Sequence, residues 1–148
     1  MNRDSSLRQR QRQRLAGDDE GSILLLSLGY AMLALVLILV CVDATSLHIA
    51  QKRLEGLADA AALAGADGFT LSVTGGEPSA ELTDDGVRDQ AAEIVEAVGT
   101  ATLIDAGTPD GVSARITVAT VWHPPVMTLF VPAGVALEAT ATSRNALR

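Results

Sequence analysis

The sequence predicts an α+β protein in which a long N-terminal helix packs on a small antiparallel sheet together with a second helix. Three observations predict this fold: an apolar run of membrane-spanning length, a helical repeat of apolar residues that continues beyond the run, and two alternating segments near the C-terminus. With 148 residues, the chain is long enough for one domain and an anchor, but too short for two ordinary domains.

The apolar run extends from Ile23 to Val42, twenty residues without a charged side chain. A helix of this length is about 30 Å long, which matches the hydrocarbon thickness of a bilayer. One alternative is a buried helix of a soluble protein, but so short a chain cannot surround a helix that is apolar on every face. The other is a cleaved signal peptide, whose apolar region would be shorter and end in small residues. We interpret 23–42 as a transmembrane helix and Cys41 as an ordinary membrane residue.

Charge is distributed unevenly on the two sides of this run. Residues 1–17 contain five arginines and one acid, whereas residues 43–148 contain fourteen acids and six bases, a balance of −8. Basic flanks stay in the cytoplasm, so the N-terminus is predicted inside and the acidic remainder outside. An acidic domain also argues against nucleic acid as a partner. The predicted division is a cytoplasmic segment 1–21, a continuous helix 22–66 (transmembrane over 23–42, external over 43–66) and an external α+β domain 67–148.

The helix is predicted to continue outside the membrane, because residues 22–76 contain no proline. Apolar residues recur there at spacings of three and four, which places them on one helix face. The second part of this face is rich in alanine and glycine, which lets another backbone approach closely, either from a partner or from the chain's own domain. We call this face the seam; it consists of Leu47, Ala50, Leu54, Leu57, Ala61 and Ala64.

The same region carries a family resemblance. Its features are Gly21 before the apolar run, "VDA" at 42–44, Leu47, the Arg53-Leu54 pair and "ADAAALAGA" at 58–66. Together they resemble the N-terminal segment of TadE/TadG-like proteins of the tight-adherence (Tad, or Flp) pilus system. The resemblance implies a pilin-like fold and a pseudopilin-like accessory subunit for pilus assembly or secretion, anchored in the cytoplasmic membrane. It also implies protein–protein association, with pilin-like or Tad-system subunits or with a second copy of the chain.

Proteolytic processing is a separate question. Pilin-like proteins resemble one another in a glycine at the cleavage site and a glutamate five residues into the mature chain. Gly21 and Ser22 would form that site here, but the fifth residue is Leu26 and the acidic "DDE" precedes the glycine. A carboxylate inside a membrane is energetically expensive and therefore functional. Its absence favours an uncleaved anchor that stays in lipid.

The external domain is predicted from caps, turns and alternation. Residues 68–83 are rich in Gly, Ser and Thr and predict a loop with a short strand at 69–73. A helix follows, capped by Thr83 or Asp84 and ended by Gly99. Its apolar face is expected at Val87, Ala91, Ile94 and Val98, and strands are expected at 101–105, 112–122 and 134–145, with a tight turn at 108–111.

The segment "HPPVMTLFVPAG", residues 123–134, is apolar but contains prolines, so it cannot be a central strand throughout. Two interpretations remain. Val126, Leu129 and Phe130 either tuck into the core from a loop, or form an exposed apolar patch for a partner or the membrane surface.

Catalytic patterns are lacking in the sequence. Its two histidines, His48 and His123, are far apart and do not have a metal-ligand spacing. There is no nucleophile elbow, phosphate loop or calcium loop. We predict no catalytic residue, metal or cofactor, and expect a structural or interaction protein of the cytoplasmic membrane with lipid as one partner. The alternative is an anchored binding module of the cell envelope unrelated to pili; an anchored enzyme is a third and weaker hypothesis.

Overall fold

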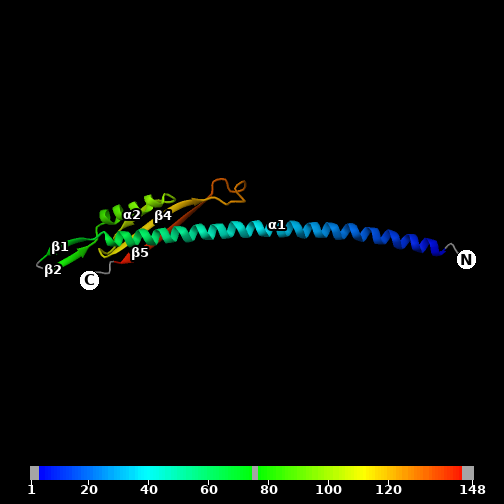
Figure 1. Cartoon of the computed structure of the whole chain (residues 1–148), viewed down its shortest axis with the longest axis horizontal. Coiled ribbons are helices and arrows are strands. Elements are labelled where there is room, and N and C mark those ends of the chain that lie inside the picture. Colours follow the sequence, from blue (N-terminus) through cyan, green and yellow to red (C-terminus); the bar gives the residue numbers. More distant parts are fainter. Residues whose placement is uncertain (1–3, 75–76, 145–148) are drawn as a thin grey trace. The chain divides into compact units, whose positions relative to one another are not determined.

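The α+β prediction is confirmed. The structure is a computed structural model that describes the backbone of residues 4–74 and 77–144 and the side chains of 22–69 and 81–144. The elements follow in the order α1, β1, β2, α2, β3, β4, β5 (Figure 1). The chain divides into two compact units, Met1–Val42 and Asp43–Arg148, and the division falls where the apolar run ends.

Helix α1 runs from Asp4 to Asp67, so it begins well before the predicted start at Ser22. The physical reason is composition, because more than half of the added residues are Gln, Arg, Leu or Ala, which favour helix, and the two glycines among them do not end it. Within the described residues, its part Ser22–Asp67 is the one helix long and apolar enough to cross a membrane, and none of its most apolar window is buried.

The segment after α1 forms a hairpin of β1 (Thr70–Thr74) and β2 (Glu77–Glu81). The predicted loop therefore contains a second strand that the sequence did not indicate. The strands are antiparallel, with Val73 opposite Pro78. Proline lacks an N–H and is excluded from central strands, but a two-stranded ribbon has only edge strands, where proline is tolerated.

Helix α2 runs from Asp84 to Val98 with both predicted ends confirmed. The Thr83 hydroxyl accepts a hydrogen bond from the Gly86 N–H at 3.2 Å, and Gly99 ends the helix in the left-handed conformation (φ 67°). The buried face consists of Val87, Ala91 and Val95. Val98, which was expected on the apolar face, is exposed and is the last residue of α2.

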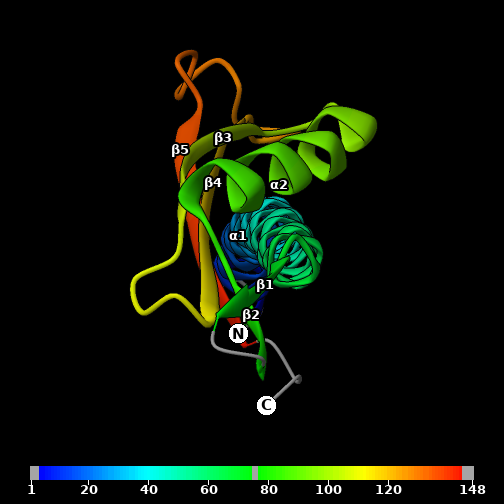
Figure 2. The same cartoon turned by 90° about the vertical axis from the view of Figure 1, so that its left-hand side faces the viewer.

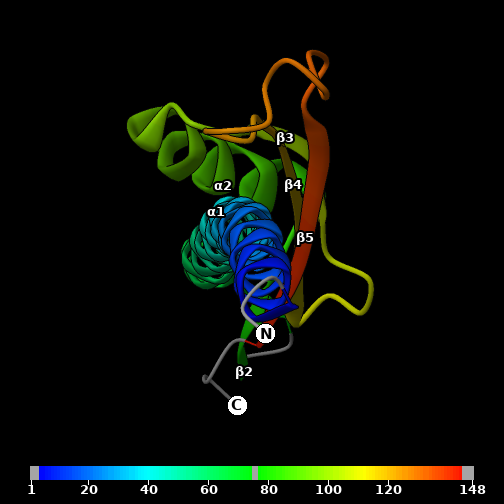
Figure 3. The same ribbon diagram turned by 90° about the vertical axis from the view of Figure 1, so that its right-hand side faces the viewer.

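The sheet consists of β3 (Thr102–Gly107), β4 (Ser113–Trp122) and β5 (Val135–Arg144), all antiparallel in the order β3-β4-β5. Figures 2 and 3 show that α2 and the C-terminal segment of α1 (residues 43–67) lie on the same face of this sheet. The core fills the space between the two helices and the sheet. Its buried apolar members are Leu54, Leu57, Ala58, Ala61, Ala62, Ala66, Leu82, Val87, Ala91, Val95, Ala106, Ala114, Ile116, Val118 and Ala139.

Candidate functional site

The seam of α1 contacts the chain's own domain. Leu54, Leu57 and Ala61 are buried in the core, and Leu47, Ala50 and Ala64 are half-buried. The flanking Ala58 and Ala62 are also buried, each about 1% exposed. The sequence left open whether the small-residue face packs against a partner or against the chain's own domain. The structure shows that it packs against the domain.

Small residues near the end of α1 allow close packing against the rest of the domain. A β-carbon built on Gly65 would lie 3.1 Å from Val87 Cγ1 and 3.4 Å from the Ala114 β-carbon. One built on Gly68 would lie 3.0 Å from the Gly86 carbonyl oxygen. The absence of side chains at Gly65 and Gly68 thus lets α1 approach α2 and the sheet closely, which is the tight packing that small residues permit.

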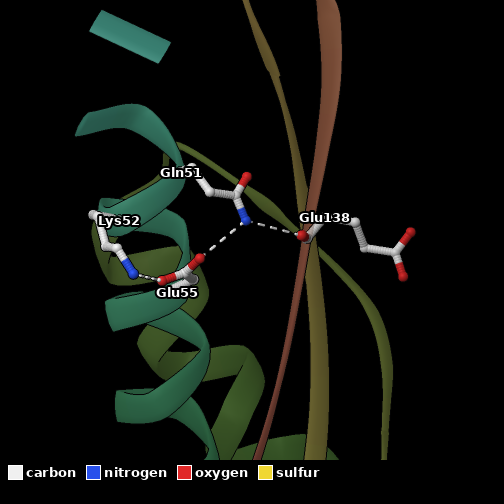
Figure 4. A network of polar contacts seen from close by, with 4 residues as sticks. All are labelled: Gln51, Lys52, Glu55 and Glu138. Atoms are coloured by element: carbon white, nitrogen blue, oxygen red, sulfur yellow. Dashed lines mark hydrogen bonds and ion pairs between the residues drawn. The ribbon is translucent and has the colours of Figure 1, made fainter. Parts of the chain in front are cut away.

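A polar network joins the C-terminal segment of α1 to β5 (Figure 4). The Gln51 amide donates to Glu55 Oε1 at 3.3 Å and to the Glu138 carbonyl oxygen at 3.4 Å, while Lys52 Nζ lies 2.7 Å from Glu55 Oε2. The hydrogen bond from Lys52 lowers the pKa of the Glu55 carboxyl, and the same bond raises the pKa of Lys52. Such exposed pairs stabilise weakly, so the network adds little to the stability of the fold.

The loop of residues 123–134 leaves the end of β4 and returns to β5; it is drawn in orange in Figure 1. The interpretation in which these three apolar residues enter the core is wrong, because all three are exposed. Leu129 is 93% exposed and Phe130 is 81% exposed, while Val126 is 41% exposed. The reason is that the connection is long enough to make its own turns, so its tip does not need to return to the sheet.

Two side-chain hydrogen bonds fix the base of this loop to α1. The Val126 N–H donates to Asp43 Oδ1 at 3.1 Å, and Trp122 Nε1 donates to Ser46 Oγ at 3.2 Å. Asp43 is only 7% exposed, and its Oδ2 has no hydrogen-bond partner among the described residues. Sequence reasoning noticed Asp43 only as the end of the apolar run and did not foresee that it holds a loop 83 residues away.

An apolar groove of about 640 Å³ lies between the C-terminal segment of α1, the end of α2 and the end of β4. Exposed Val98 and Val121 contribute to its walls, and the small residues Gly56 and Ala60 line the side formed by α1. The groove is concave and mostly apolar and has few polar groups, so it is better suited to bind another protein than to catalyse a reaction. No sequence signal pointed to it, because its residues come from three separate elements.

The remaining residues considered from the sequence are not brought together. His48, His123 and Cys41 are all exposed, and Gly21 and Ser22 lie within α1. In the part of the chain whose side chains are described, no three His, Cys, Asp or Glu residues lie close enough to hold a metal ion.

The geometry defines a class of protein: an α+β domain built around the end of a helix whose preceding segment 23–42 is apolar on all sides. Within that class, residues 21–68 match the family of putative Flp pilus-assembly TadE/G-like proteins, and the chain is TadE/TadG-like over this segment. This confirms the resemblance seen in the sequence. The matched family is one of pilus assembly and not of enzymes, which supports a pilus-related function. No curated protein and no solved structure matches the chain.

Proposed function

We propose that the chain is a single-pass, membrane-anchored accessory subunit of a Tad/Flp-type pilus or secretion system, pseudopilin-like and not cleaved after Gly21. The observation that carries this proposal is the coincidence of two boundaries. The family match over 21–68 begins at the apolar run and ends with α1, so it includes both the anchor and the helix that forms the domain core.

The proposed orientation places the N-terminus in the cytoplasm and the domain outside. Five arginines precede the apolar run, and Lys and Arg near a membrane-spanning helix favour the cytoplasmic side. The exposed face of α2 has the opposite character, with the acidic residues Asp85, Asp89, Glu93 and Glu96.

Topology tests the anchor directly. In a Cys41→Ser background, cysteines introduced at Gln9 and Thr142 would be treated with a membrane-impermeant maleimide on intact spheroplasts and then after lysis. We expect Thr142→Cys to react before lysis and Gln9→Cys only afterwards. Reaction of Gln9→Cys before lysis, or recovery of the chain in the soluble fraction, would contradict the proposed topology.

Association with other subunits is the second part of the proposal. Most of the seam is covered by the chain's own domain, so we assign the association surface to the apolar groove, which Ala50, Leu54 and Leu57 of the seam help to line. Ala60 lines this groove and is exposed, whereas Ala58, two residues away, is buried. This pair provides a matched test.

A photoactivatable crosslinker attached to Ala60→Cys should form adducts with another Tad-system subunit or a second copy of the chain in cells. Ala58→Cys should react poorly and give no adducts, because its side chain is covered. Absence of adducts from Ala60→Cys in cells that assemble pili would remove the groove from the proposal. Deleting the gene and counting surface filaments tests the pilus role itself.

A further inference from the structure

We propose that the loop 123–134 is a second membrane contact, whose tip lies in the outer interface of the bilayer that α1 crosses. The proposal rests on the membrane anchoring proposed above and adds a lipid-binding surface on the domain itself. Leu129 and Phe130 are the residues that would enter the interface. The occupant is therefore the lipid surface, not a protein partner.

The chemistry of the tip fits an interface. Among the side chains of the domain that the structure describes, Leu129 and Phe130 are the most exposed large apolar ones, and the neighbouring Val126 and Met127 are also exposed. Leaving large apolar side chains of this kind exposed to water is unfavourable. A bilayer interface would remove much of this apolar surface from water.

The tip is a formed turn and not a loose strand of chain. The Phe130 and Val131 N–H groups both donate to the Met127 carbonyl, at 2.9 and 3.1 Å. The Thr128 hydroxyl donates to the Pro124 carbonyl at 2.6 Å. These bonds satisfy backbone groups locally, which an element entering the interface requires because unpaired N–H and C=O groups are costly away from water.

The position of the loop is set by the chain itself. Asp43, which holds the Val126 N–H, is the residue that directly follows Val42 at the end of the apolar run. Trp122, at the loop base, bonds to Ser46 one turn further along α1. Leu129 is three residues from Val126, a reach of at most about 10 Å. This upper limit is comparable with the depth of the headgroup region, about 5–8 Å on each side of the hydrocarbon core, so the bond to Asp43 keeps the tip close to the end of the apolar run.

The loop and the strand residues that flank it also differ from the rest of the domain in charge. Residues 116–137, from β4 through the loop into β5, contain no Asp, Glu, Lys or Arg, although residues 43–148 carry a balance of −8. A charged side chain that enters a bilayer interface loses part of its hydration, which is costly. Residues 116–137 are the one long stretch after Asp43 that has no such charge to desolvate. Tryptophan at the base is the residue that membrane interfaces favour most, together with tyrosine.

The test uses the full chain in phosphatidylcholine vesicles, with an environment-sensitive NBD fluorophore on single cysteines in a Cys41→Ser background. Leu129→Cys reports on the loop tip. Val112→Cys is the matched control, because Val112 is apolar, exposed and at the opposite end of β4, about 30 Å away for a strand of that length. Leu33→Cys, inside the apolar run, reports on the anchor. The vesicles carry nitroxide-labelled lipid as quencher, on the headgroup or on the acyl chain.

We expect blue-shifted emission and quenching by headgroup nitroxide at position 129, quenching by acyl-chain nitroxide at position 33, and neither at position 112. Quenching at 33 without quenching at 129 overturns the loop contact, leaves the anchor intact and assigns the apolar tip to a protein partner. Equal quenching at 112 and 129 also overturns it, because the whole domain would then lie on the surface. No quenching at 33 removes the anchor, and the loop contact with it. Unchanged Trp122 emission in each unlabelled variant shows that the domain has kept its fold.

Discussion

The carboxylate of Asp43 accepts a hydrogen bond from the backbone N–H of Val126, which is 83 residues further along the chain. The bond joins the first residue of the compact domain unit to a loop between its last two strands. A buried carboxylate is costly unless it is hydrogen-bonded, so its place here is explained by the backbone group that it satisfies.

Asp43→Ala should loosen the loop. Removing the acceptor leaves the Val126 N–H unpaired, which costs about 1 kcal/mol for a net hydrogen bond and corresponds to roughly fivefold faster amide exchange. Hydrogen exchange followed by mass spectrometry of a peptide covering 123–134 measures this. Asp43→Asn is the control, because it retains a carbonyl acceptor and should exchange nearly as slowly as the unaltered chain. Equal exchange in the Ala variant and the unaltered chain would show that the bond does not hold the loop.

Gly65→Val should destabilise the domain by about 1–3 kcal/mol, the usual consequence of adding atoms to a packed core. Its side chain would meet Val87 and Ala114, since the first added carbon is already 3.1 Å from Val87 Cγ1. Gly56→Val is the matched control on the same helix, because a β-carbon there has no neighbour within 4 Å. Urea unfolding of the full chain in detergent, followed by Trp122 fluorescence, gives both values. Similar midpoints for the two variants would argue against tight packing at Gly65.

Gly134→Ala should destabilise the domain by more than Gly111→Ala. Both glycines have positive φ, 71° and 73°, so both substitutions carry the left-handed backbone strain of about 1 kcal/mol. Only at Gly134 would the new carbon also clash, at 2.6 Å from Val121 Cγ1 and 2.8 Å from the Trp122 carbonyl oxygen. The difference between the two melting temperatures therefore isolates the steric part. A larger loss at Gly111 would mean that the loop yields easily to the added carbon.

Asp110 gives the domain a predictable response to acid. The N–H of Val112 is the main cause that lowers the pKa of this carboxyl, with help from the Ser113 hydroxyl and N–H and from Arg144. A carboxyl whose pKa is lower in the folded state stabilises the fold above its unfolded value of about 3.9. This stabilisation is lost as the pH falls through the lower folded value.

Asp110→Asn should accordingly lower the urea midpoint at pH 7, and the difference from the unaltered chain should shrink as the pH falls below about 4. Urea titrations of both chains at pH 7 and pH 3 measure the two differences. A difference that stays constant between these pH values would mean that ionisation of Asp110 does not contribute.

Local signals in the sequence predicted the elements whose ends depend on neighbouring residues. Thr83 and Gly99 fixed α2, because caps act within one turn, and alternation located β4 and β5. The β2 strand was missed because Glu77, Pro78 and Ser79 have no strand preference of their own and pair only with β1.

The candidate surfaces were less predictable, because they depend on contacts between distant segments. The period of the seam was evident, but not that Leu54 and Ala61 would face the sheet. The loop tip at Leu129 and Phe130 was left with two interpretations, since an apolar sequence between prolines fits both a core and a surface. The bond from Asp43 that holds the loop base had no sequence signal at all.

The core contains residues from widely separated parts of the chain, and this determines when it can form during synthesis. The buried apolar set runs from Leu54 to Ala139, so the sheet that covers α1 is incomplete until β5 has been synthesised. At about 5–20 residues per second, the ribosome needs on the order of ten seconds to produce the intervening stretch. For that time the helix face at Leu54 and Leu57 is uncovered, because the sheet that buries it in the folded protein is not yet complete.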